Sequence, residues 1–216
     1  KKNDKYLSAG ENTTVVSAEG TDANSYYAHW ELLTKDQLVE ELRNSGASFS
    51  NPQNATFFIN GFDFNRYDNI RNGAWKGTSI TTIGGGTSES TYWRFCAEMW
   101  NKTYDVYQEL TGLPNGVYRL TAQAFYRNGT DNSSTVVNAR LYAGNQSVPV
   151  PSINDGQAVP GSLSGAANAF SDNNRIRYQC TPIEVIVTDG NLRIGIKNEN
   201  SVTADWTAFD NFHLTY

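Results

Sequence analysis

The sequence of 216 residues is poor in histidine, cysteine and charge. It contains two histidines and two cysteines, and 18% of its residues are charged. His29 and His213 are far apart, which argues against a His-rich metal site and against a Ser-His or Cys-His catalytic pair. Cys96 and Cys180 both fall in strand-like segments, so two outcomes stay open: they form a disulfide, or they are two buried thiols.

Two further absences narrow the range of partners. The formal net charge is −5, so we expect no nucleic-acid partner, because nucleic-acid binding depends on clustered basic residues. No apolar run approaches the roughly 20 residues that a membrane-spanning helix needs. We therefore expect a chain that does not span a membrane.

Aromatic residues and glycines are plentiful instead. The chain has 12 tyrosines, 10 phenylalanines, 5 tryptophans and 18 glycines, a composition typical of a turn-rich sheet protein. Aromatic rings beside hydrogen-bonding groups also suit sugar recognition. Because β-sandwiches bury aromatic rings in their cores as well, both explanations stay open for any single ring.

The local patterns predict many strands and one short helix. Thr34 and Gln37 form a capping box that starts a helix, and Asn44-Ser-Gly46 ends it. The segment Ser152–Asn174 is rich in small and polar residues and is predicted to be a long loop. Regularly spaced strands with one helix outside them predict an all-β fold, namely a β-sandwich. The main predicted strands are Tyr92–Trp100, Tyr104–Leu110, Val117–Arg127, Thr135–Ala143, Gln146–Pro149, Ile183–Val187, Leu192–Ile196 and Ala208–Tyr216.

A polar stretch with Pro52 separates two predicted domains, 1–46 and 47–216. The first would hold the helix and a small N-terminal β arm of short strands at Lys5–Ala9, Thr13–Ser17 and Ala28–Leu33. The second would be the sandwich.

Four motifs in a fixed order carry a family resemblance: Gln108 within Tyr104-Asp-Val-Tyr-Gln-Glu-Leu110, Leu113-Pro-Asn-Gly-Val-Tyr118, Gly190-Asn-Leu-Arg-Ile-Gly195 and Trp206-Thr-Ala-Phe-Asp-Asn-Phe212. Over about residues 56–216 the chain resembles the galactose-binding-like jelly rolls of carbohydrate-binding modules, particularly those in secreted proteins of polysaccharide-degrading gut bacteria. The resemblance implies a jelly-roll β-sandwich that is a monomeric module of a larger secreted or cell-surface protein and binds a glycan or polysaccharide. Two further motifs, Lys5-Tyr-Leu-Ser-Ala9 and Trp30-Glu-Leu32, are similar to the repeats of ricin-type domains. Residues 1–33 therefore resemble part of a β-trefoil, either as a truncated domain or as an arm.

The same resemblance implies a structural Ca²⁺ ion held by Asp210, with Asn60, Asp63 and Asn65 as companions. Strict alternation in the last strand puts Asp210 on one face with apolar Phe212, so this carboxylate would need a strong partner if that face is buried. Calcium takes 6–8 oxygen ligands and is one such partner. The alternative is that these Asp and Asn residues only stabilise turns.

Two surfaces are candidates for glycan contact, since aromatic rings stack on sugars and planar Arg or Gln groups pair with hydroxyls. The first is one face of Val117–Arg127, extended by Tyr107 and Glu109; its members are Arg119, Gln123, Phe125 and Arg127. The second is a loop tip that contains Tyr92, Trp93 and Trp100, or else Trp75. We expect Tyr118, Trp206 and Phe209 to lie in the core.

The predicted function is a non-catalytic carbohydrate-binding module. One alternative is a structural or adhesive spacer domain without glycan binding, because a fold does not fix a function. A second alternative is a glycoside hydrolase that uses Glu98 and Glu109 as its two carboxylates, if they lie on adjacent strands. Nothing in the sequence marks a pocket that would shift the pKa of either residue.

Overall fold

A computed structural model of the chain describes residues 33–64, 73–86, 94–130, 135–156, 159–171 and 177–216. The chain forms two compact units, residues 1–38 and 39–216. The predicted N-terminal β arm and the trefoil-like motifs lie outside the described residues, apart from Leu33. The second unit begins within helix α1 (Lys35–Asn44). Among the described residues, no helix is long and apolar enough to cross a membrane.

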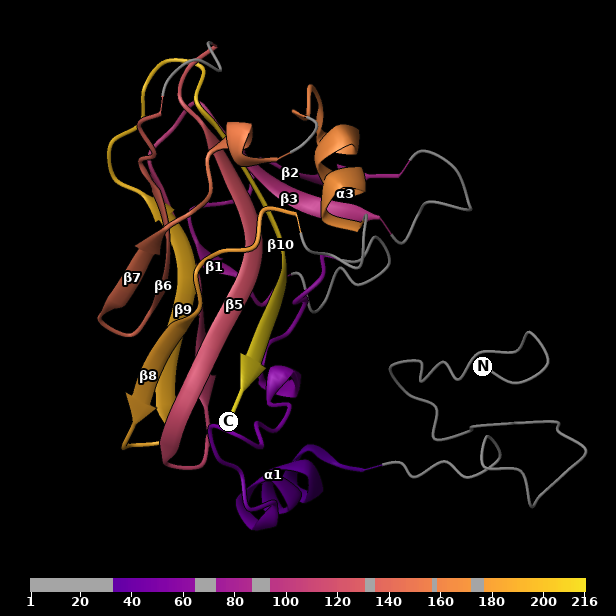
Figure 1. Ribbon diagram of the computed structural model, residues 1–216, viewed down its shortest axis with the longest axis vertical. Helices are drawn as coiled ribbons and strands as arrows, with labels where there is room; N and C mark the ends of the chain where they lie inside the picture. Colours follow the sequence, from indigo (N-terminus) through magenta and orange to yellow (C-terminus); the bar gives the residue numbers. More distant parts are fainter. Residues whose placement is uncertain (1–32, 65–72, 87–93, 131–134, 157–158, 172–176) are drawn as a thin grey trace, which may run out of the picture. The chain divides into compact units, whose positions relative to one another are not determined.

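In the described part of the second unit, the strands form two five-stranded antiparallel sheets (Figure 1). The β4 sheet has the order β1-β4-β9-β6-β7, and the β10 sheet has the order β2-β3-β10-β5-β8. The predicted all-β sandwich is confirmed, and β1 and β2 are strands that the sequence patterns missed. The first sheet consists of β1 (Lys76–Gly77), β4 (Tyr104–Thr111), β9 (Asn191–Asn198), β6 (Ala139–Ala143) and β7 (Gln146–Pro149), and the second of β2 (Thr82–Gly85), β3 (Phe95–Trp100), β10 (Trp206–Thr215), β5 (Gly116–Arg127) and β8 (Ile183–Val187).

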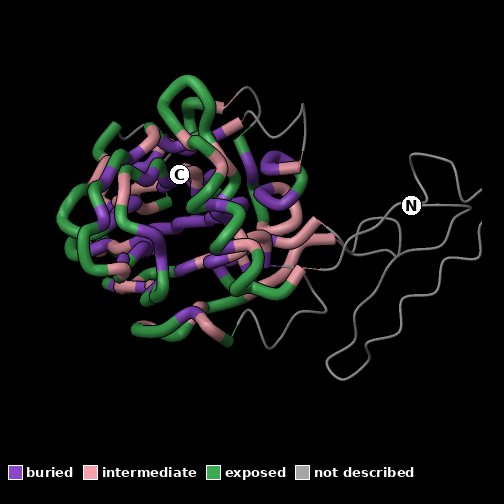
Figure 2. Tube along the Cα trace, turned by 90° about the horizontal axis from the view of Figure 1, so that it is seen from below, coloured by how far each residue is buried: buried purple, intermediate pink, exposed green. Residues whose placement is uncertain are grey.

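The main core lies between the two sheets. Alternate side chains of β5 enter it, from Tyr118 to Tyr126, and each of them is at most 1% exposed. From the other sheet, Val106, Ile194 and Ile196 complete the layer. Buried stretches of the chain run through the strands, while most turns between them are exposed (Figure 2). The predicted inward face of β5 is therefore confirmed.

A second apolar layer lies on the outer side of the β10 sheet. Helix α3 (Leu163–Ser171) packs on β2, β3 and β10 (Figure 1) and buries Phe170 against Phe125 and Trp206. Ser162 accepts a hydrogen bond from the Gly165 N–H at 3.2 Å and so caps the start of this helix. The prediction of a long loop over Ser152–Asn174 is thus wrong, since this stretch also contains the short 3₁₀ turn Ile153–Asp155.

Strand β10 contains a bulge that breaks its alternation. The register shifts between Asp210 and His213, and Asn211 has a φ of 51°. As a result Phe209 and Phe212 both face the main core, whereas Asp210 falls on the outer side, next to the Cys96 thiol. The prediction that Asp210 shares a face with Phe212 is wrong because the extra residue inverts the pattern.

The segment before the sheets pairs with the end of the chain. The N–H of Gln53 donates to the Tyr216 carbonyl at 2.9 Å, and the Tyr216 N–H donates to the Gln53 carbonyl at 2.9 Å. The Ala55 N–H also donates to the Leu214 carbonyl at 2.8 Å. We call this pairing the terminal clasp. It completes the edge of β10 beyond the end of β3.

The capping box of α1 is confirmed. The Thr34 N–H donates to Gln37 Oε1 at 2.8 Å, and the Gln37 N–H donates to Thr34 Oγ1 at 3.2 Å. Two donors that a helix start leaves open are therefore satisfied.

The two cysteines are free and buried. Cys96 lies in the layer under α3, whereas Cys180 lies in the main core, so the β10 sheet separates them. Burial raises the pKa of both thiols, that of Cys180 to about 12. Of the two outcomes left open by the sequence, the two buried thiols are confirmed.

Candidate functional site

Helix α3 divides the outer face of the β10 sheet into a covered middle and two open ends. Gln123 and Phe125 lie in the covered middle and are 0% exposed. Gln123 donates to the Arg177 carbonyl at 2.7 Å and accepts from Asn211 at 2.6 Å, so its amide is already used. The Phe125 ring centre lies 4.9 Å from that of Trp206. The prediction that these two residues belong to an open binding surface is therefore wrong.

The first open end holds a stack of two tryptophans and an arginine. Trp206 lies opposite Trp100 on one side and opposite Arg127 on the other. The Arg127 guanidinium carbon is 5.1 Å from the centre of the Trp100 ring and 5.3 Å from that of Trp206. Trp206 is 3% exposed and Trp100 is 42% exposed. We call this group the Trp100 stack, and it joins two residues that the sequence had assigned to separate surfaces.

Hydrogen bonds hold the stack in place. Arg127 Nε donates to the Gly129 carbonyl at 2.8 Å, and the Trp206 indole N–H donates to Glu98 Oε2 at 2.9 Å. Burial lowers the pKa of Arg127, yet an arginine stays charged at neutral pH. Glu98 and Trp100 are two residues apart on β3 and share its outer face. The site therefore offers a held aromatic ring, a cation and a carboxylate side by side.

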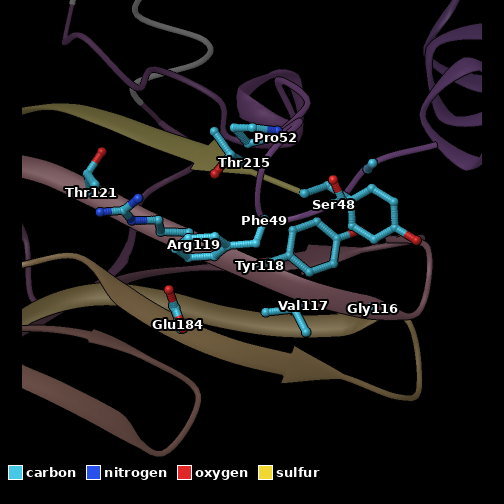
Figure 3. Close-up of a pocket in the computed structure, with 12 residues that line it drawn as sticks. Ser48, Phe49, Pro52, Gly116, Val117, Tyr118, Arg119, Thr121, Glu184 and Thr215 are labelled. Carbon is cyan, nitrogen blue, oxygen red and sulfur yellow. The ribbon is translucent and has the colours of Figure 1, made fainter. Parts of the chain in front are cut away.

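The second open end is a groove of about 600 Å³ at the other end of the same sheet face (Figure 3). Arg119, a predicted ligand residue, lies in its floor beside Val117. Phe49, which is 87% exposed, forms one wall. We call this cavity the Phe49 groove. It is lined by Ala47, Ser48, Phe49, Pro52, Gly116, Val117, Tyr118, Arg119, Thr121, Glu184, Thr215 and Tyr216.

Sequence reasoning missed Phe49, although a signal was present. The residue stands alone among polar neighbours in the stretch Ser48-Phe-Ser-Asn51, where no periodic pattern calls for a buried ring. In the structure, Ser48 and Asn51 exchange two main-chain hydrogen bonds at 3.0 and 3.2 Å. This tight turn presents the Phe49 ring to solvent.

Tyr107 lies on the opposite side of the sandwich from Arg119 and Arg127. It belongs to the outer face of the β4 sheet, where the Arg193 guanidinium carbon is 4.1 Å from its ring centre. Arg193 Nε in turn donates to Glu109 Oε1 at 2.7 Å. The prediction that Tyr107 and Glu109 extend the surface of Arg119 is wrong, because consecutive strands β4 and β5 belong to different sheets.

A close-packed tyrosine completes the β4 face. The Tyr142 hydroxyl donates to Asp105 Oδ1 at 2.6 Å. A Cβ atom on Gly195 would lie 2.8 Å from the Tyr142 ring, so only glycine fits beneath it. On this face, charged and aromatic groups are bonded to one another.

The two carboxylates considered for glycoside hydrolysis do not form a pair. Glu98 is on the outer face of the β10 sheet and Glu109 on the outer face of the β4 sheet. Packed sheets are about 10 Å apart, and these side chains point away from each other. The prediction that they could lie on adjacent strands is wrong.

The other predicted residues have varied positions. Trp93, Tyr92 and Asn65 lie outside the described residues. Trp75 is a core residue whose indole N–H donates to the Gly61 carbonyl at 3.0 Å. The expected core positions of Tyr118 and Phe209 between the sheets and of Trp206 beneath α3 are confirmed.

The residues expected to bind calcium come from β10 and from the turn before Trp75, and the Phe212 N–H joins the two by donating to the Phe62 carbonyl at 2.9 Å. Asp210 is on the outer side of the β10 sheet, next to Cys96. The main-chain N–H of Asn60 donates at 3.1 Å to Oε1 of Gln108, a residue of strand β4 in the other sheet. Asp63 belongs to the same turn as Asn60. In the parts of the chain that the structure describes, no group of three or more His, Cys, Asp or Glu side chains is arranged to hold a metal ion. Asn65 lies outside the described residues, and the calcium site stays a prediction.

Comparison with known proteins gives structural similarity only. No family model matches the chain, and no curated protein sequence is similar to it. One similar solved structure is a family 61 carbohydrate-binding module in complex with β-1,4-galactotriose, with 16% identity and a TM-score of 0.41; the match covers 75% of this chain and 97% of that one. Another is an arabinose-bound α-L-arabinofuranosidase, with 10% identity and a TM-score of 0.38; the match covers 72% of this chain and 26% of that one. Neither similarity bears on what this chain binds.

Proposed function

We propose that this chain is a non-catalytic carbohydrate-binding module, part of a larger secreted or cell-surface protein, and that it contacts glycan through the Trp100 stack. The observation that supports this function is the partly exposed Trp100 ring packed against Arg127. The Arg127 guanidinium also packs against the buried ring of Trp206. The extracellular setting rests on the resemblance of its strand motifs to those of carbohydrate-binding modules.

The stack has the groups that sugar recognition uses. A pyranose ring has an apolar face that packs on an aromatic ring, and its hydroxyls need donors and acceptors at the edge. The carboxylate of Glu98 is fixed by Trp206 through one oxygen, and its second oxygen would accept from a sugar hydroxyl. Arg127 would donate from beside the ring. A site of this small size gives affinities in the millimolar to micromolar range, about −4 to −8 kcal/mol.

A glycan array with two matched variants tests the proposal. Trp100→Ala removes the stacking surface and is expected to weaken binding at least about tenfold, as for an aromatic anchor. Tyr107→Ala removes an aromatic ring from the opposite face and should change the affinity by less than about twofold. Circular dichroism of both variants checks that they remain folded.

Two outcomes contradict the proposal. If the wild type binds no glycan across plant, mucin and capsule polysaccharides, the chain is a spacer module. If Tyr107→Ala loses binding and Trp100→Ala retains it, the β4 face carries the site instead.

A further inference from the structure

The floor of the Phe49 groove contains an arginine and a glutamate that do not bond to each other. Arg119 on β5 lies directly opposite Glu184 on β8, and both residues are exposed. Among the described residues, neither side chain makes a hydrogen bond or an ion pair. The Arg119 guanidinium, a donor, and the Glu184 carboxylate, an acceptor, therefore line the same cavity, and both can bond to a ligand.

The walls of this cavity are aromatic and held in place. Phe49 stands on the turn closed by Ser48 and Asn51. On the other side, the Tyr216 hydroxyl donates to the Asn115 carbonyl at 3.1 Å, and its ring packs so closely over Gly116 that no Cβ fits there. The turn that carries Phe49 and the Tyr216 side chain are thus each fixed by hydrogen bonds before a ligand binds, which lowers the entropic cost of binding.

The balance of apolar and polar groups narrows the class of ligand. Phe49, Pro52 and Val117 bring apolar side chains to the lining of the groove, and Arg119 and Glu184 bring charged groups (Figure 3). A fully hydroxylated hexose can lay its C–H face on one apolar wall, but it then turns hydroxyls toward the opposite wall, where they lose hydrogen bonds with water. A sugar in which a methyl group stands in place of the hydroxymethyl group, or an acetamido group in place of a hydroxyl, presents a methyl group there and avoids this cost.

We propose that the Phe49 groove is a second ligand site, which takes a sugar ring bearing a methyl group, as in a 6-deoxyhexose or an N-acetylhexosamine. Arg119 donates to the sugar oxygens, Glu184 accepts from a hydroxyl, and the methyl group packs against the carbon-lined walls. The volume of about 600 Å³ lies within the usual range for small-ligand sites. This inference rests on the proposed function for its ligand class but uses none of the residues of the Trp100 stack.

Titration followed by two-dimensional amide NMR tests the second site. L-Fucose, N-acetylglucosamine and galactose are added separately to the wild-type chain. We expect shifts in β5 and β8 around Val117–Thr121 and Glu184 with fucose or N-acetylglucosamine, and an affinity at least about fivefold weaker with galactose. Comparing the first two sugars shows whether the deoxy or the acetyl methyl group is preferred.

Two variants locate the site. Phe49→Ala changes a side chain that is 87% exposed, so the fold is retained, and binding at β5 and β8 should weaken at least about tenfold. Glu184→Gln keeps the shape of the floor and should weaken binding about threefold or more. Ile186→Ala, which changes an exposed β8 residue outside the groove lining, is the matched control and should have no effect.

The outcomes for the two sites are separate. The groove proposal is overturned if none of the three sugars shifts the amides of β5 and β8, if galactose binds there as well as the methyl sugars, or if Phe49→Ala leaves the affinity unchanged. Shifts confined to Trp100, Arg127 and Trp206 would support the Trp100 stack alone. Shifts confined to the groove would support this inference and contradict the first site.

Discussion

Each outer face of the sandwich carries an arginine and a glutamate opposite each other on neighbouring strands. On the β4 sheet, Arg193 and Glu109 are hydrogen-bonded at 2.7 Å, and the guanidinium stacks on Tyr107. On the β10 sheet, Arg119 and Glu184 have the same cross-strand relationship but form no ion pair within the described residues. The same residue types at equivalent spacing are thus bonded on one face and open on the other.

The difference follows from the surroundings of each pair. The Arg193 guanidinium carbon lies over the Tyr107 ring, 4.1 Å from its centre, and Arg193 Nε donates to Glu109 Oε1. Arg119 instead lines the Phe49 groove. Arg193 and Glu109 are bonded to each other, whereas Arg119 and Glu184, which make no such bond among the described residues, keep their bonding capacity for a ligand beside the aromatic wall. Residue composition alone therefore does not identify a binding face.

The largest expected effect is on the free energy of unfolding, which should fall for a substitution in the covered middle of the β10 face but not for one at an open end. Phe125→Ala should lower the free energy of unfolding by about 3–5 kcal/mol, because it leaves a cavity under α3. Phe49→Ala should change it by less than about 0.5 kcal/mol, as for an exposed side chain. Urea denaturation measures both. A cost below about 1 kcal/mol for Phe125→Ala would mean that the middle of the face is open.

The next largest expected effect is a loss of stability at alkaline pH, caused by the buried thiol of Cys180. Burial raises the pKa of Cys180 to about 12 from its usual value of 9.0, so the folded state favours the neutral thiol. This contribution to stability is complete below pH 9 and is lost as the pH rises toward 12. The unfolding free energy should therefore fall over this range, and less steeply in Cys180→Ala, by up to about 1.4 kcal/mol per pH unit. Denaturation at several pH values measures this fall. If the unfolding free energy falls equally steeply with pH in the wild type and in Cys180→Ala, the result contradicts a buried thiol.

The smallest effect compares the two Arg–Glu pairs directly. Glu109→Gln breaks a formed surface ion pair and should lower the melting temperature by about 1–2 °C at low salt. Glu184→Gln breaks none and should leave it unchanged. At 1 M salt the difference should vanish, because exposed charges are then screened. A larger loss for Glu184→Gln would show that Arg119 and Glu184 do bond in solution.

Much of the sandwich was predictable from sequence, because turn residues mark where many of its strands begin and end. In β5, inward residues from Tyr118 to Tyr126 alternate with outward ones that are polar except for Phe125, and turn residues lie at both ends. The helix start at Thr34 was predictable for a similar reason, since a capping box is a local pattern with a local cause. Each of these features depends only on residues close together in the chain.

The middle of the β10 face was not predictable in the same way. Alternation indicates only that Phe125 points away from the main core, and α3 covers it from about 40 residues further along the chain. The apolar spacing of Leu163, Ala166 and Phe170 was a usable signal for that helix. The bulge at Asn211 had no such signal. The Trp100 stack depends on the order of strands β3, β10 and β5, which local patterns do not give.

The terminal clasp has a mechanical consequence. Gln53 and Tyr216 are paired at the same end of an antiparallel ladder. If the chain is pulled from residue 53 and from Tyr216, the load falls first on the hydrogen bonds that join these two residues, and the ladder peels open one step at a time. The sheets of the sandwich bear tension only after the clasp has opened, so a stretched chain would lengthen here before either open end of the β10 face is distorted.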